Sequence, residues 1–187
     1  MTVARTKGGF LKTYEFTLFI DGMTESTDEF ANAMFEAGCD DGTCGSSCGR
    51  VFIAFDREAD SFLEGVLSAI ADVHRGGYQV WRIDEADQVT QSDIARRLSV
   101  SRQMVHQYVS GQRGPGDFPP PMSDTKSGQK LWSWGEVATW LHGNNFLDEE
   151  MLEQSSIINV INSFLSIRRE EGLKPQLVKT IRKAVLS

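Results

Sequence analysis

Three cysteines lie close together and could bind a metal. Cys39, Cys44 and Cys48 fall in a Gly- and Ser-rich stretch that also holds two aspartates. Three thiolates could hold zinc or an iron–sulfur cluster, with an Asp, His74 or a residue of another chain as the fourth ligand. The Cys-x4-Cys-x3-Cys spacing lacks the CxxC pairs of strong metal motifs. We therefore expect a loop with incidental thiols and no cofactor, and we keep a metal-binding sensor as the alternative.

Other residues suited to acid–base chemistry stand together at Asp56, Arg57 and Glu58. We expect this run at the start of a helix, where the acids would cap the helix and the arginine would pair with a neighbour. The chain has no Gly-rich phosphate loop, no nucleophile elbow and no HExxH motif. We predict that the protein is not an enzyme.

A different group of polar side chains has the donors needed to read DNA bases. Arg102, Gln103, His106 and Gln107 would share the outward face of one helix. Arginine can bond guanine through two hydrogen bonds, and glutamine can do the same with adenine. Phosphate oxygens would suit the residues at the starts of this helix and of the one before it, which are Ser101, Gln91 and Ser92.

Two short helices must position these side chains. Gln91–Leu98 (QSDIARRL) predicts an amphipathic helix, Ser99–Val100 a turn, and Ser101–Ser110 (SRQMVHQYVS) a second helix with Ser101 as its N-cap. Ala95 would permit close approach of the two helices. The contact would be filled by Ile94, Leu98, Val100, Val105 and Tyr108.

This window resembles the helix-turn-helix of DNA-binding regulators over its whole length. Ser99 departs from the pattern, because the family usually has Gly there and the left-handed backbone costs another residue roughly 1 kcal/mol. The alternative is a helical hairpin with a polar, solvated face.

The following segment, Gly111–Leu141, resembles the same part of MerR-like and phage-excisionase-like winged domains. The resemblance lies in the pair Phe118–Pro119, a wing over Met122–Leu131, and a packing helix marked by Trp132, Val137, Trp140 and Leu141. It implies a winged helix-turn-helix that binds double-stranded DNA.

The residues of this segment fit such a wing. Ser127–Gly128 supply a turn, with Lys126 and Lys130 on either side of the tip. These lysines and Arg113 would contact backbone phosphates or the minor groove. We expect Trp132 and Trp140 to pack in the core and Trp134 to be exposed.

The net charge of −7 disfavours a nucleic-acid partner until its distribution is counted. Residues 1–85 carry seven Lys or Arg against fifteen Asp or Glu, whereas 86–142 carry six against five and 143–187 carry six against six. The acidity therefore belongs to the N-terminal part. No run of roughly 20 apolar residues and no signal peptide is present, so we expect a cytoplasmic protein.

The acidic part alternates strand and helix signals. Apolar residues repeat every second position from Tyr14 to Ile20 and run from Val51 to Phe55, and Tyr78–Ile83 gives a third strand. Helical spacing joins Phe30, Met34 and Ala37 after a cap at Thr27 or Asp28, and then Phe62, Val66, Ile70 and Val73. This order predicts a small α/β layer domain, β-α-β-α-β. Its stretches GCDDGTCGSSCGRVFIAFDREA and SAIADVHRGG look like the upstream part of some bacterial helix-turn-helix proteins.

Two amphipathic helices end the chain, over Asp148–Glu170 and Pro175–Leu186. Their apolar faces favour pairing with a second copy, so we expect a homodimer. The predicted fold is α+β, with an α/β domain (1–85), a winged helix-turn-helix (86–142) and a C-terminal helical hairpin (143–187).

The predicted function is a dimeric transcriptional regulator, a repressor of its own operon, that binds double-stranded DNA. The alternative is an antitoxin or phage-defence accessory protein, which would bind a protein partner through its acidic domain and use the helix-turn-helix for autoregulation.

Overall fold

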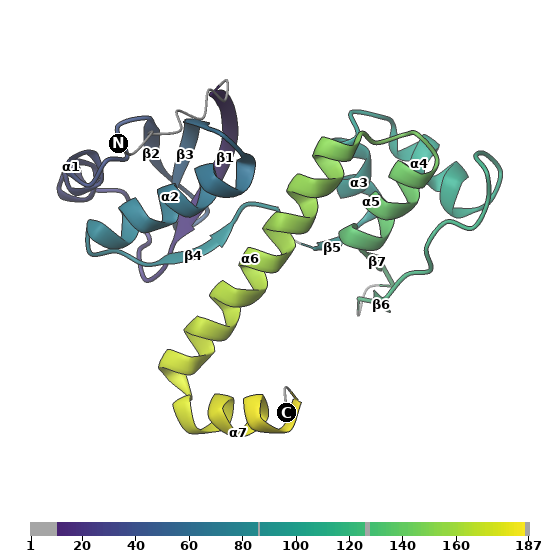
Figure 1. Ribbon diagram of the computed structural model, residues 1–187. Coiled ribbons are helices and arrows are strands. Elements are labelled where there is room, and N and C mark those ends of the chain that lie inside the picture. The colour runs from purple at the N-terminus through teal and green to yellow at the C-terminus, as the bar shows by residue number, and fades with distance from the viewer. Residues whose placement is uncertain (1–10, 86, 126–127, 186–187) are drawn as a thin grey trace, which may run out of the picture. The chain divides into compact units, whose positions relative to one another are not determined.

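The computed structural model describes residues 11–85, 87–125 and 128–185 of the chain, which form seven helices and two antiparallel sheets (Figure 1). The fold is therefore α+β. The chain divides into two compact units, one formed by residues up to Asp84 together with those from Ile161 onward, the other by Glu85–Val160. The expected third region, 143–187, is not a unit of its own in this division.

The first unit contains a four-stranded sheet with strand order β2-β3-β1-β4, in which all neighbours are antiparallel. Its elements are β1 (Lys12–Ile20), α1 (Asp28–Glu36), β2 (Gly42–Ser47), β3 (Arg50–Ala59), α2 (Phe62–Arg75) and β4 (Val80–Ile83). The order along the chain is β-α-β-β-α-β. This is a split β-α-β arrangement, because β3 lies between β1 and β2, and β1 lies between β3 and β4.

Strand β2 corrects the expected β-α-β-α-β order. Its sequence, GTCGSS, has little β-propensity, which is why the pattern of this cysteine-containing stretch predicts a loop. Backbone pairing with β3 forms the strand instead, with Cys44 opposite Ile53. Gly45 is suited to its place because a Cβ there would lie 2.6 Å from Cζ of Phe52, whose ring occupies that space.

Helix α2 lies across one face of the sheet (Figure 1) and contacts β1, β3 and β4. That face carries the fully buried side chains of Leu18, Ile20, Val51 and Ile53. Local signals set where the helices begin, since the expected cap Thr27 opens α1, and Ser61 opens α2 by accepting a bond from Glu64 N.

The run Asp56–Glu58 lies within β3 and not at a helix start, which corrects that expectation. Strand alternation points Arg57 into the buried face, where 9% of its side chain is exposed. Its guanidinium donates to both oxygens of Asp41 and to Oδ2 of Asp72, each at 2.7 Å, and also to Ser68 and the Gly38 carbonyl. Arg57 is therefore ion-paired, but with Asp41 and Asp72 from two other segments of the chain and not with a neighbour at a helix start.

Helix α6 (Glu149–Leu173) covers the free edge of β4 with its C-terminal half. The amide of Asn162 accepts from Ile83 N at 2.8 Å and donates to Ile83 O at 3.2 Å, which satisfies backbone groups that an edge strand leaves unpaired. Arg168 bonds Gln79 and lies 3.0 Å from Nε2 of His74. Burial, with the Arg168 charge, lowers the pKa of His74. Helix α7 (Pro175–Val185) follows.

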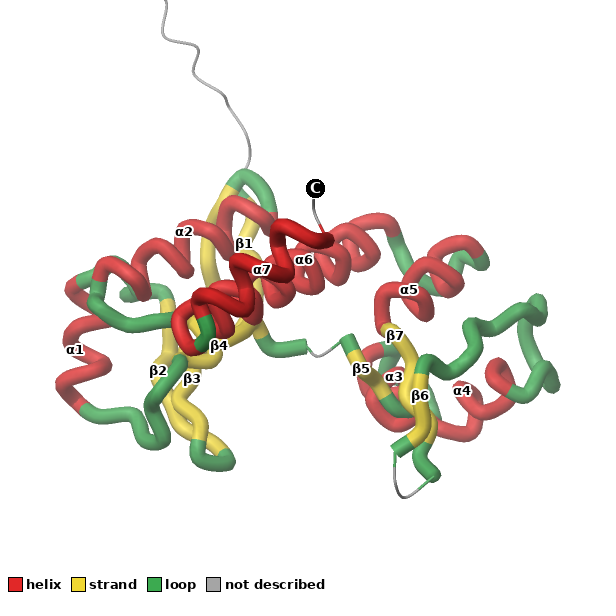
Figure 2. The backbone as a smooth tube through the Cα atoms, turned by 90° about the horizontal axis from the view of Figure 1, so that it is seen from below, coloured by secondary structure: helices red, strands yellow, loops and turns green. Residues whose placement is uncertain are grey.

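The second unit has a three-stranded sheet with strand order β5-β7-β6, drawn in yellow in Figure 2. Its elements are β5 (Gln88–Val89), α3 (Gln91–Arg97), α4 (Arg102–Val109), β6 (Ser123–Asp124), β7 (Lys130–Ser133), α5 (Trp134–Gly143) and the start of α6. No sequence pattern indicates the two-residue strand β5, which pairs Val89 with Trp132.

The core of this unit contains Trp132 as expected, with Trp140 packed against it. The expected exposure of Trp134 is wrong, because only 4% of its surface is exposed. Its indole donates to Oγ of Ser155 at 2.9 Å, and the Arg97 guanidinium lies 4.6 Å from its ring centroid. Partners for both its polar edge and its face make burial of this indole favourable.

Within the described ranges, no helix combines the length and the apolar character that crossing a membrane requires.

Candidate nucleic-acid interface

Helices α3 and α4 form at the positions that the sequence predicts. Thr90 caps α3 by accepting from Asp93 N, and the Asp93 carboxylate accepts in return from Thr90 N at 3.0 Å. The hydrogen bonds that this carboxylate accepts from the Thr90 N–H and from the Thr90 hydroxyl lower the pKa of Asp93. The turn to α4 passes through Ser99, whose φ of 52° is the left-handed conformation that the sequence predicts for this position.

Replacing Ser99 by Gly should stabilise the protein by about 1 kcal/mol, because Gly adopts this backbone conformation without a steric penalty. The matched control is Ser110→Gly. Ser110 has a φ of −87° and should gain nothing from the change. Urea unfolding of both variants measures the difference, and equal midpoints would contradict the argument.

Helix α4 has one buried and one exposed face. Ser101 caps its start by accepting from Met104 N at 3.2 Å. Val105 and Tyr108 are buried and fix the helix to the core. Arg102, Gln103 and His106 lie on the exposed side, and Gln107 is half-buried. Three of the four candidate base-reading side chains are therefore presented to solvent by a helix that the core holds in place.

The loop after α4 is fixed by aromatic side chains. Trp140 Nε1 donates to Gly116 O at 2.9 Å, and Trp132 Nε1 donates to Pro119 O at 3.0 Å. The Phe118 ring lies against both indoles, 5.0 Å from Trp140 and 6.4 Å from Trp132 by centroid. The ring contacts explain a large aromatic residue at position 118, whereas the contact at Pro119 is made by its backbone carbonyl.

Arg113 lies in the same loop. It is exposed, and its backbone N–H donates to Gln107 O at 3.1 Å. Gly114 is in close contact with Tyr108, since a Cβ there would lie 2.9 Å from the Tyr108 ring. The backbone beside Arg113 is thus bound to α4, and the arginine is held near the exposed face of that helix.

Strands β6 and β7 form the expected hairpin. Asp124 pairs with Lys130, and Thr125 N donates to Gln129 O at 2.8 Å. Lys130 is exposed on this hairpin. Lys126, the other predicted wing contact, lies outside the described residues, as does Ser127 of the predicted turn.

The start of α3 carries the remaining predicted contacts, with Ser92 exposed and Gln91 half-buried. Sequence reasoning overlooked Arg96, whose side chain is 77% exposed and lies 2.8 Å from Asp93. Arg96 directly follows the inward-facing Ile94 and Ala95, and this helical spacing could have predicted that its side chain faces solvent. Arg96 is thus a further candidate for a phosphate contact.

The three cysteines are placed differently from one another. Cys39 is buried, Cys44 is half-buried in β2, and Cys48 is exposed at the β2–β3 turn. Burial, with the nearby Asp72, raises the pKa of Cys39 to about 11, and burial also raises the pKa of Cys44. Among the residues that the structure describes, no three His, Cys, Asp or Glu side chains are grouped as a metal site.

Comparison of the chain with models of protein families, with curated protein sequences and with solved structures finds no match.

Proposed function

We propose that this protein is a sequence-specific, double-stranded DNA-binding regulator of transcription, acting as a dimeric repressor of its own operon. The observation that carries the proposal is helix α4, which exposes Arg102, Gln103 and His106 while Val105 and Tyr108 anchor its other face. We take α3 and α4 as a helix-turn-helix and the β6–β7 hairpin as its wing. The resemblance of Gly111–Leu141 to MerR-like and excisionase-like winged domains supports the same proposal.

Helix α4 would enter the major groove as the recognition helix. Arg102 and Gln103 stand in its first turn, where recognition helices meet base edges, and they suit guanine and adenine respectively. His106 lies one turn further along the same exposed face and can donate to or accept from a base. Ser101, Ser92 and Gln91 would contact the flanking phosphates.

Lys130 and Arg113 would bind phosphates without reading sequence. Replacing Lys130 by Ala should weaken binding to all duplexes alike, and it should flatten the plot of log affinity against log salt by about 0.9 for each phosphate that is no longer neutralised. Fluorescence anisotropy at several salt concentrations measures this slope. Lys12→Ala, which removes an equal charge from an exposed position on β1, should leave the slope unchanged. A slope equal to wild type in the Lys130 variant would argue against a role for the wing.

A selection from random DNA duplexes tests the function as a whole. The full chain should enrich one motif, and a dimer should enrich it as two half-sites related by symmetry. If several rounds yield no motif while the protein remains folded, sequence-specific duplex binding is refuted.

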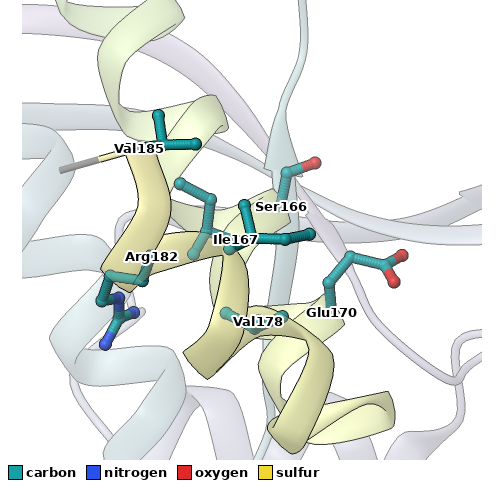
Figure 3. Close-up of a pocket in the computed structure, with 7 residues that line it drawn as sticks. Ser166, Ile167, Glu170, Val178, Arg182 and Val185 are labelled. Atoms are coloured by element: carbon teal, nitrogen blue, oxygen red, sulfur yellow. The ribbon is translucent and has the colours of Figure 1, made fainter.

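The dimer would form through α6 and α7. An apolar groove of about 360 Å³ runs between these helices, lined by Ser166, Ile167, Glu170, Val178, Ile181, Arg182 and Val185 (Figure 3). No described residue of α7 is buried, and Leu177, Ile181 and Val185 are all exposed. Exposed apolar surface of this kind marks association sites. A second α7 would suit the groove through the apolar face of the helix, because Glu170 and Glu171 already pair with Lys174 and Arg182 of the same chain.

Replacing Ile181 by Asp should convert the dimer to a monomer, because a carboxylate would have to be buried in the apolar contact. Sedimentation equilibrium at micromolar concentration measures the mass. Thr180→Asp adds the same charge to the neighbouring exposed position and should remain dimeric. A monomeric wild-type protein would refute the dimer without affecting the assignment of α4.

A further inference from the structure

The face of the four-stranded sheet opposite α2 carries a cluster of aromatic rings. Strand alternation turns Leu18 and Ile53 toward α2, and it turns their neighbours Phe19 and Phe52 to the other side. Phe19 on β1 has its ring centroid 6.3 Å from that of Phe52 on β3 and 6.2 Å from that of Trp81 on β4. All three rings are half-buried, so part of each remains open to solvent. We call these three residues the aromatic platform.

Two arginines lie over the platform. The Arg50 guanidinium is 4.1 Å from the centroid of Trp81, and that of Arg82 is 5.5 Å from both Phe19 and Trp81. Arg82 also forms an ion pair with Asp84 at 2.9 Å. Across the described ranges, Arg50 has no carboxylate within ion-pair distance, and the buried Nε of Arg82 has no hydrogen-bond partner. The platform therefore combines rings with cationic donors that the fold itself does not fully use.

Gly45 keeps the platform flat. A side chain at this position of β2 would overlap the Phe52 ring, so Gly allows that ring to lie down over the neighbouring strand. Small residues continue the same face, with Thr17 beside Ala54 and Ala54 beside Thr43. Bases can stack on such a surface without entering a pocket.

The acidity of this part of the chain is concentrated away from the platform. Asp41 and Asp72 face Arg57 on the helix side of the sheet. Glu15, Asp56 and Glu58 lie on the open face. The nearest of them, Glu15 and Asp56, are four residues along their strands from Phe19 and Phe52, a distance of about 13 Å. At the platform itself, Arg82 pairs with the Asp84 carboxylate at 2.9 Å, and Arg50 forms no ion pair with the residues that the structure describes. The local charge thus suits a phosphate-bearing ligand although the whole domain is acidic.

We propose that the aromatic platform binds single-stranded nucleic acid, with bases stacked on Phe19 and Phe52 and a phosphate bound by Arg50, whose guanidinium lies over Trp81. Aromatic rings and guanidinium planes on an open sheet are the chemistry that recognises unpaired bases, since every base has a π-face. A duplex does not suit this surface, because its bases are already stacked within the helix. The site goes beyond the proposed function and uses none of the residues of α4.

The test uses the full chain and a fluorescent oligothymidylate of about 12 nucleotides. Micromolar binding is expected, and Phe52→Leu and Phe19→Leu should each weaken it at least about five-fold by replacing a ring with an aliphatic side chain. Phe52→Tyr should bind the oligonucleotide as the wild type does, because it keeps an aromatic ring at this position. Phe35→Leu is the matched control, since Phe35 lies on α1 and is 68% exposed. Arg50→Gln, which leaves the rings in place, should weaken binding and flatten its salt dependence.

The proposal is overturned if the full chain does not bind oligothymidylate at tens of micromolar, or if the Phe52→Leu, Phe19→Leu and Arg50→Gln variants bind as wild type does. Binding of a protein partner to the same face without any binding of the oligonucleotide would also overturn it. Should Phe52→Leu fail to fold by circular dichroism, Arg50→Gln decides. The Arg102→Ala, Gln103→Ala variant should retain single-strand binding, so failure of the duplex function is distinguishable from failure of this one.

Discussion

Replacing Arg102 and Gln103 together by Ala should reduce affinity for the selected operator by about 30-fold or more. Each bidentate contact between such a side chain and a base contributes roughly 1–3 kcal/mol of discrimination. Both side chains lie on the exposed face of α4, so their truncation should leave the core around Val105 and Tyr108 intact. The loss should therefore appear in binding and not in thermal stability.

The measurement is a titration of wild type and variant against the selected duplex and a scrambled one. The variant should lose affinity for the selected duplex and approach the affinity that both proteins show for the scrambled one. Lys12→Ala is the control, because it removes a single cation from an exposed position on β1, outside α4 and outside the helices proposed for the dimer. If the Arg102, Gln103 variant keeps the wild-type ratio between the two duplexes, α4 is not the recognition helix.

Replacing Arg57 by Met should destabilise the first unit by about 3 kcal/mol, because the change leaves the half-buried Asp41 carboxylate without its counterion and leaves Asp72 with Arg75 alone. Asp41 and Asp72 each lie 2.7 Å from this guanidinium, and 13% of the Asp72 side chain is exposed. The same substitution also removes the donors to Ser68 and to the Gly38 carbonyl. The free energy of unfolding in urea measures the effect.

Arg75→Met is the control for that experiment. Arg75 also bonds Asp72, at 2.8 Å, but its side chain is 65% exposed. Its loss should cost at most about 1 kcal/mol, as for surface ion pairs in general. A triple variant that adds Asp41→Asn and Asp72→Asn to Arg57→Met should recover part of the lost stability, because the uncompensated charges are gone. Equal losses of stability in Arg57→Met and Arg75→Met would show that burial of the Arg57 ion pairs does not determine their contribution to the free energy of unfolding.

The elements that local signals specify could be predicted from the sequence. Helices α3 and α4 follow from helical spacing and from Ser101 as a cap, and the left-handed conformation at Ser99 follows from the position of Gly in similar motifs. The hairpin over Met122–Leu131 follows from the turn residues Ser127–Gly128 within that segment and from its resemblance to a wing. Each of these depends on interactions within a few residues along the chain.

Features that depend on distant partners could not be predicted in the same way. Strand β2 exists because β3 pairs with it, and its Gly and Ser residues carry no strand signal of their own. Arg57 finds its carboxylates 16 and 15 residues away, on either side along the chain. The partners of Trp134 come from α3 and from α6, so the burial of Trp134 could not be predicted from the residues next to it in the sequence.

The aromatic platform was overlooked for a different reason. Val51–Phe55 is a continuous apolar run, which is typical of a strand buried on both faces. The structure buries Val51, Ile53 and Phe55 and leaves Phe52 half-exposed beside Phe19. Only the register between β1 and β3 reveals that the side chains pointing away from α2, such as Phe19 and Phe52, lie together on one surface.

The bonds between Asn162 and Ile83 have a practical consequence for dividing the chain into fragments. A fragment that ends near residue 85 would lack Ile161 and Leu165, which are buried in the whole chain, and would leave the outer edge of β4 with unsatisfied donors and acceptors. Such an edge is a template for strands of other molecules. Aggregates or exchanged strands formed by that fragment would then be mistaken for partner binding. A usable fragment of the acidic part therefore has to carry the C-terminal half of α6, joined to it by a linker.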